Sequence, residues 1–134
     1  MFEKYSDSFL NNFNFDSLID KFSGKKFISF RKNEIIFSEN SMVNEVFFIL
    51  SGEVNLVRRN SFSEYDLLTV SQSGDILGFY DALTNCVHSH TAVAVKDTNV
   101  FAVDRSDMMR LINRKDDFNF WALKYLSKRI VCHD

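Results

Sequence analysis

The sequence predicts a mainly β fold, an antiparallel sandwich or roll, with one helix before the strands and two helices after them. Between residues 25 and 104 the chain consists of short runs rich in β-branched and aromatic residues, separated by turn-forming residues. Outside this stretch, apolar residues recur at roughly helical spacing. Many short strands at regular intervals are typical of an antiparallel sandwich or a barrel-like roll.

The composition narrows the class of protein. The length of 134 residues suits one domain spanning 1–134, and the 15 Phe residues favour strands around an aromatic core. The net charge of -2 shows no basic excess, so this stretch is not expected to bind nucleic acid by itself. The two cysteines lie far apart, and the chain has no signal-like N-terminus and no apolar run near the ~18 residues of a membrane helix. These features predict a cytoplasmic protein without membrane contact.

An N-terminal helix region is predicted over residues 1–23. Ser6 or Asp7 can cap this helix, because both side chains accept hydrogen bonds from the free N–H groups at a helix start. The apolar residues that recur at roughly helical spacing are Phe9, Leu10, Phe13, Leu18, Ile19 and Phe22.

Strands are predicted within residues 25–104, and turn formers separate them. The runs are KKFISF, EIIF, EVFFIL, EVNLVRR, DLLTV, TAVAV and NVFAV. Gly52 is predicted to form a tight hairpin between the third and fourth runs, since glycine adopts a positive φ most easily. Gly74 marks a second turn. Asn33 and Asn40 stand at further turns, where asparagine also tolerates a positive φ.

Residues 105–134 are predicted to form two C-terminal helices, the first with Ser106 as a candidate cap. The second helix carries apolar residues on more than one side, so one stripe can pack on the strands while another needs a partner. We therefore expect a homodimer formed through this helix; the alternative is one broad face buried within a monomer. The candidate interface residues are Phe118, Trp121, Ala122, Tyr125, Leu126 and Ile130.

Four strings carry a resemblance to a known family. They are KNEIIFSEN at 32–40, FFILSGEVNL at 47–56, SGDILG at 73–78 and TAVAVKDTNV at 91–100. Together they resemble the cyclic-nucleotide-binding domain of the catabolite-activator and FNR-like transcription regulators. The resemblance covers roughly residues 25–130. It implies an antiparallel β-roll, a jelly-roll-like double-stranded β-helix, with one N-terminal helix and two C-terminal helices.

The resemblance also implies a phosphate-binding segment that begins at Gly78, where a missing side chain lets backbone N–H groups approach an anion. Phe79 stands where the family has a glutamate that accepts from the ribose hydroxyl. His88, Ser89 and His90 stand where it has Arg, Ser or Thr, and Ala, and that arginine pairs with the cyclic phosphate. Because charge-assisted hydrogen bonds contribute about 1.5–3 kcal/mol each, we expect no cyclic AMP binding in the usual way.

The sequence therefore does not determine the identity of the ligand. A cyclic nucleotide is a candidate although the family Glu and Arg are absent, and the sequence identifies no cofactor. The candidate ligand-binding residues are Gly78, Phe79, Tyr80, His88 and Ser89. Phe79 and Tyr80 can stack on a base, or Phe79 can instead fill the vacated site as part of the core. Ser89 can bind a phosphate or can simply begin a strand.

A second candidate site is a group of metal ligands. Cys86, His88 and His90 stand at i, i+2 and i+4, so in an extended stretch all three point to one face. Thiolate and imidazole ligands suit zinc, copper or haem iron. The resemblance adds that a carbon-monoxide-sensing haem regulator of the family has a similar Cys-x-His pair. The alternative is a surface loop with incidental histidines.

We interpret the chain as the effector-sensing regulatory domain of a catabolite-activator-like transcription regulator. A ligand-free dimerisation or interaction module, and a haem or metal sensor, are the alternatives. No catalytic motif occurs, so an enzyme is not expected. No helix-turn-helix pattern follows the last predicted helix, so contact with DNA would need a module absent from this chain.

Overall fold

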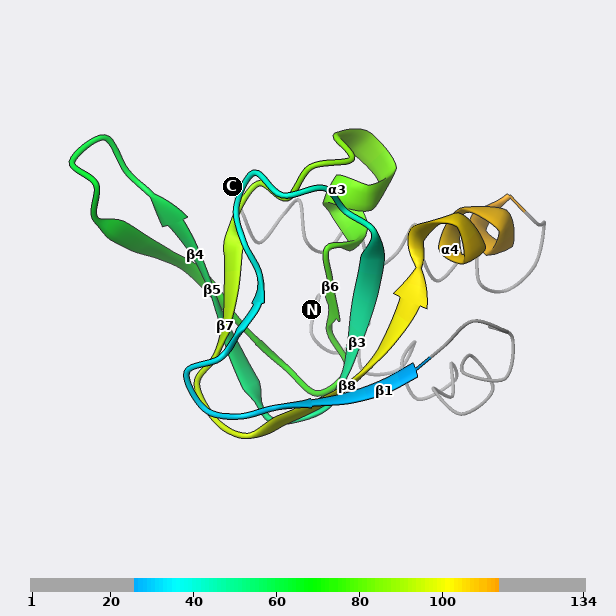
Figure 1. Cartoon of the computed structure of the whole chain (residues 1–134), viewed down its shortest axis with the longest axis horizontal. Helices are drawn as coiled ribbons and strands as arrows, with labels where there is room; N and C mark the ends of the chain where they lie inside the picture. The colour runs from blue at the N-terminus through cyan, green and yellow to red at the C-terminus, as the bar shows by residue number, and fades with distance from the viewer. Residues whose placement is uncertain (1–25, 114–134) are drawn as a thin grey trace, which may run out of the picture. The chain divides into compact units, whose positions relative to one another are not determined.

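The computed structural model describes residues 26–113 (Figure 1). The chain divides into two compact units. Residues Lys25–Arg105 form one unit, and the second consists of Met1–Gly24 together with Ser106–Asp134. That residues 1–134 make up one sensor domain stays a prediction.

Within residues 26–113, eight strands form two antiparallel sheets of four strands each, which confirms the predicted mainly β, antiparallel class. Sheet A has the strand order β1-β8-β3-β6, and sheet B has the order β2-β7-β4-β5. The strand bounds are β1 (Lys26–Phe30), β2 (Ile35–Phe37), β3 (Glu45–Ser51), β4 (Glu53–Arg59), β5 (Tyr65–Gln72), β6 (Ile76–Leu77), β7 (Thr91–Ala94) and β8 (Thr98–Asp104).

The strand pairs are nested like the two arms of one long hairpin. β4 pairs with β5 at its tip, and β3 with β6, β2 with β7 and β1 with β8 follow outward. The tip is a short turn in which the Asn60 N–H donates to the Glu64 carbonyl, while the Asn60 side chain accepts from Phe62 and Glu64. The β4–β5 tip projects from the remaining strands in Figure 1. Successive strand pairs along this hairpin belong alternately to sheet B and sheet A. The long hairpin is therefore folded over on itself, and a core lies between the two sheets.

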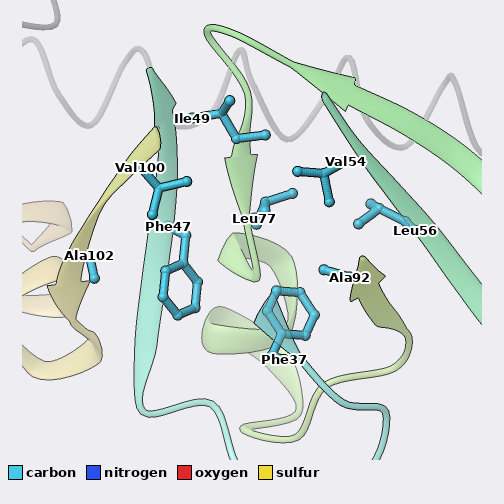
Figure 2. Packing of buried hydrophobic residues seen from close by; sticks show 9 residues of the cluster. All are labelled: Phe37, Phe47, Ile49, Val54, Leu56, Leu77, Ala92, Val100 and Ala102. Carbon is cyan, nitrogen blue, oxygen red and sulfur yellow. The ribbon is translucent and has the colours of Figure 1, made fainter. Parts of the chain in front are cut away.

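The core lies between the two sheets (Figure 2). Sheet A contributes Phe47 and Ile49 from β3, and sheet B contributes Val54 and Leu56 from β4. The side chains in Figure 2 point toward one another from both sheets, and the full cluster is Phe37, Phe47, Ile49, Val54, Leu56, Leu77, Ala92, Val100 and Ala102. Alternate positions along a strand share a face, so Phe47 and Ile49 point into this core while Val46, Phe48 and Leu50 belong to the other face of β3.

The other face of sheet A is also buried at its two central strands, β3 and β8. Phe48 stacks on Phe101 with ring centroids 4.4 Å apart, and neither side chain is exposed. Val46 and Val103, which pair across β3 and β8, are equally buried. A strand that is buried on both faces needs no polar alternation, which explains the continuous apolar run VFFIL that follows Glu45.

Gly52 has the predicted positive φ, 108°, but the predicted hairpin is wrong. The strands that it joins, β3 and β4, lie in different sheets, so the chain turns a corner there rather than reversing within one sheet. A β-carbon at Gly52 would lie 2.4 Å from Thr98 Oγ1 and 2.8 Å from the Asp97 carbonyl oxygen. Glycine is therefore required by close approach of two segments as well as by its backbone angle.

The turn prediction for the two asparagines is confirmed. Asn33 has a φ of 76° and Asn40 a φ of 71°, both in the left-handed region. Each asparagine also connects its turn to a segment that is distant in the sequence. The Asn33 N–H donates to the Ala94 carbonyl, and the Asn40 N–H donates to the His88 carbonyl. The second bond connects this turn to the segment that leads into β7.

Two short helices accompany the sheets in the described range. α4 (Arg105–Ile112) confirms the first of the two predicted C-terminal helices. α3 (Phe79–Thr84) was not predicted, because six residues are too few to show a helical repeat. The N-terminal helix predicted over 1–23 and the second C-terminal helix lie outside the described residues. No helix among residues 26–113 is long and apolar enough to cross a membrane.

The Gly52→Ala variant tests the corner. We expect it to lower the free energy of unfolding by about 3 kcal/mol or more, because backbone strain of about 1–3 kcal/mol combines with a collision against Thr98. Gly74→Ala is the control, since Gly74 also has a positive φ, 96°. Urea denaturation of both variants is the measurement. Equal decreases in the free energy of unfolding of the two variants would show that the collision with Thr98 adds nothing to the backbone strain.

Candidate functional site

The segment formed by residues 78–90 joins β6 to β7 and contains α3; we call it the cassette segment. It opens at Gly78, which has a φ of 81° and precedes the first residue of α3. A β-carbon placed on Gly78 would lie 3.1 Å from Cε1 of His88. The absence of a side chain at Gly78 therefore makes room for the ring of His88.

His88 is a core residue. Its side chain is 3% exposed, and its ring lies flat on Phe37 with centroids 3.7 Å apart and an interplanar angle of 11°. Its backbone N–H donates to the Ser41 carbonyl, which fixes the ring over the core. Within the described residues, the Nδ1 atom of His88 has no hydrogen-bond partner.

Burial lowers the pKa of His88 from 6.5 to about 4. The charge of Asp81 raises this pKa and that of His90 lowers it, but both effects are smaller than desolvation. The imidazole is therefore neutral at pH 7. A neutral, stacked ring is suited to packing and does not supply a fixed positive charge.

Asp81 is the residue of the segment that the sequence analysis missed. It lies on α3 and is 2% exposed, and its Oδ2 accepts from the backbone N–H of Ser89 at 2.8 Å and from the Ser89 hydroxyl at 3.0 Å. Its Oδ1 accepts from the Asn85 side chain at 3.4 Å. A buried carboxylate needs such donors because it has lost its water shell. Nothing local in the sequence marks it, since aspartate is usually exposed.

Ser89 is held from several directions. While its N–H and hydroxyl point at Asp81, its carbonyl accepts from Nε of Arg58 on β4 at 3.0 Å. The Ser89 hydroxyl also lies 3.1 Å from Nδ1 of His90, and that nitrogen is 3.9 Å from Oδ2 of Asp81. The cassette segment is thus a connected polar cluster of Asp81, Ser89 and His90, fastened to sheet B by Arg58.

The structure brings together three of the five predicted ligand-binding residues. Gly78 and His88 are in contact, and Ser89 follows directly. Phe79 is 1% exposed and belongs to the buried residues of α3. Tyr80, at 50% exposure, lies on the outer side of the same helix. That these residues bind a ligand stays a prediction.

The premise of the predicted metal site is wrong. Cys86 has a φ of 61°, so the stretch that begins there is not extended and does not place three side chains on one face. Cys86 is exposed, whereas His88 is buried against Phe37. Among residues 26–113, no group of three His, Cys, Asp or Glu side chains is arranged to hold a metal ion. The predicted dimer residues between 118 and 130 lie outside the described range.

The chain matches the family model described as "Cyclic nucleotide-binding domain" over residues 27–115. A curated relative, the cyclic AMP receptor protein of Thermus thermophilus, is 30% identical to it over 79 residues. That match covers 59% of this chain and 37% of the relative.

Solved structures share the fold. Thermus thermophilus catabolite activator protein superposes with a TM-score of 0.75 at 23% identity, and the match covers 86% of this chain and 54% of that one. FixK2 from Bradyrhizobium japonicum has a TM-score of 0.72 at 20% identity, with 81% and 54% covered. At these identities the likeness shows the fold alone. This chain spans about half of the length of these two structures.

The buried histidine predicts a pH dependence of stability. The pKa of His88 is about 4 in the folded chain against 6.5 for the ordinary group, so the unfolded chain binds more protons between these values. Stability should therefore fall as the pH drops from 6.5 to 4, by at most about 1.4 kcal/mol per pH unit from this group. Denaturant unfolding at several pH values measures the slope. His88→Gln should flatten this slope, because glutamine does not titrate. Parallel curves for wild type and His88→Gln would contradict the prediction.

Proposed function

This chain belongs to the family of cyclic nucleotide-binding domains, and we propose that it is the effector-sensing regulatory domain of a CRP/FNR-like transcription regulator that does not bind cyclic AMP in the usual way. The observation that carries the second part is the state of His88. It occupies the position at which the family resemblance places an arginine, and it is buried and neutral.

A cyclic phosphate carries a permanent negative charge, so its site benefits from a permanent positive charge. His88 offers none at pH 7, and its ring is already stacked on Phe37. Phe79, at the position of the family glutamate, is buried and has no acceptor for a ribose hydroxyl. Each charge-assisted hydrogen bond that is lost removes about 1.5–3 kcal/mol. Two such losses correspond to a decrease in affinity of about 100-fold or more.

The regulatory role completes the proposal. The relatives named above include a catabolite activator protein and a cyclic AMP receptor protein, and this chain corresponds to about half of the former. In the proposed protein, the domain regulates rather than catalyses, works in the cytoplasm, and influences DNA only through a separate module. An effector would act by favouring one of two arrangements of the domain.

A ligand-free interaction module is the second candidate. The side chains that fill the cassette segment favour it, since Phe79 and His88 leave almost no surface of their own exposed there. Such a domain would transmit signals only through its contacts with other chains. The two candidates differ in whether any small molecule stabilises the folded state.

Thermal unfolding with a panel of cyclic mono- and dinucleotides tests the proposed function. A ligand at 100 times its Kd adds about 2.7 kcal/mol of stability, which shifts the Tm by several degrees. We expect no shift of the Tm with cyclic AMP at 1 mM. A stabilisation of about 2.7 kcal/mol at that concentration would require a Kd of about 10 μM. A micromolar Kd for cyclic AMP measured by calorimetry would contradict the proposal. A shift with another compound would favour the sensor over the ligand-free module.

The predicted homodimer has its own test. In the chain, Leu126→Glu should convert a dimer into a monomer, because a charge buried in an apolar interface is strongly unfavourable. Lys128→Glu is the control, because Lys128 is outside the predicted apolar stripes. Sedimentation velocity over a range of concentrations measures the state of association. A wild-type chain that stays monomeric at about 100 μM would overturn the prediction. At that concentration a dimer with a binding free energy of about -5.5 kcal/mol or stronger is detected.

A further inference from the structure

The buried carboxylate of Asp81 has a role that the proposed function does not use. We propose that Asp81 is an intramolecular anion that occupies the hydrogen-bond donors of the cassette segment, and so determines specificity by excluding oxyanionic ligands. The inference relies on the proposed function only in placing an effector site at the cassette segment.

The donors converge as they would on a bound oxyanion. The N–H and the hydroxyl of Ser89 both point at one oxygen, Oδ2 of Asp81, at 2.8 and 3.0 Å. Backbone N–H and hydroxyl groups are the donors with which proteins hold the oxygen atoms of phosphates and carboxylates. Here the oxygen comes from the chain itself. An incoming oxyanion therefore finds these two donors already engaged.

The charges at the segment also oppose a second anion. Asp81 is 2% exposed, so water screens its charge poorly. His88 is neutral at pH 7, and Nε of the nearby Arg58 already donates to the Ser89 carbonyl. His90 is the other titratable side chain beside the carboxylate, at 3.9 Å. Arg58 keeps its positive charge, but its side chain is exposed, so water screens that charge. An oxyanion that entered next to Ser89 would therefore meet the poorly screened like charge of Asp81.

The same carboxylate holds the segment closed. The backbone carbonyl of Asp81 accepts from the N–H groups of Asn85 and Cys86, which ends α3, and its side chain then connects α3 to Ser89 at the entry of β7. Removal of the carboxylate would leave the two Ser89 donors without their acceptor and leave room beside them. That arrangement is an empty site for a small oxyanion.

The ligand class of the native domain follows. With Asp81 in place, an effector that binds at the cassette segment is uncharged or cationic, and a cyclic phosphate or other oxyanion is excluded. The specificity would thus be set by one residue that competes for the donors, in addition to the loss of the family arginine.

The experiment is chemical rescue of Asp81→Ala. The wild type, this variant and Asp66→Ala are melted with sodium formate or inorganic phosphate, at an ionic strength matched with sodium chloride. Asp66 is the control because it is an exposed carboxylate that accepts only from the Asn60 side chain among the described residues. We expect Asp81→Ala to have a lower Tm than the wild type and to regain part of it with either anion. It should bind phosphate at least tenfold more tightly than the wild type, and the Ser89 amide resonance should shift on titration.

Three results would overturn the inference. One is a folded Asp81→Ala that shows no response to either anion, and another is a wild type that responds equally. The third is an undiminished response in the double variant Asp81→Ala/Ser89→Ala. If Asp81→Ala does not fold, Asp81→Asn takes its place: it keeps an acceptor for Ser89 but removes the charge, and it must bind phosphate more tightly than the wild type. Failure of rescue leaves the proposed function intact. Cyclic AMP binding by the wild type would refute both the proposed function and this inference, whereas binding of another cyclic nucleotide would refute this inference alone.

Discussion

A carboxylate removed from water must be given hydrogen-bond donors, and in this chain that requirement organises the connection between β6 and β7. Asp81 obtains both Ser89 donors, and Ser89 is in turn fixed to β4 by Arg58. The six-residue helix α3 that carries Asp81 is shorter than a helix that could persist by itself. Its place is therefore maintained by tertiary contacts, of which the buried carboxylate is the most demanding.

Around this carboxylate, buried side chains of the chain itself fill the cassette segment. Gly78 lacks a side chain, and the space goes to the His88 ring. That ring continues the aromatic contact from Phe37 to Phe47, whose centroids are 6.1 Å apart. The segment is thus continuous with the core between the two sheets. A structural change in the cassette segment would first displace Phe37 and the other residues of that core, because close-packed interiors transmit strain.

Local chemistry was sufficient to predict some features and not others. The strand runs and the positive φ of Asn33 and Asn40 follow from the residues at those positions. The role of Gly52 does not, because the sheet to which a strand belongs depends on nested pairing between distant segments. The Asp81–Ser89 contact could not be predicted for the same reason. The two residues are eight positions apart in the sequence, and only the fold of the intervening turn brings them together. The resemblance to a family drew attention to this segment, but it implied a bound ligand there and gave no indication of this contact.

The nested pairing of the strands also has a consequence for how this unit can be combined with other proteins. Its outermost pair is β1 with β8, which lie side by side in Figure 1. In this pair Lys26 lies opposite Ala102. The chain therefore enters and leaves the two-sheet unit along neighbouring strands of sheet A. A unit whose entry and exit are adjacent can be spliced into a host chain with little distortion of either partner, as tolerated domain insertions illustrate. Recombination can thus exchange the polypeptide attached at these two ends while every strand pair inside is preserved.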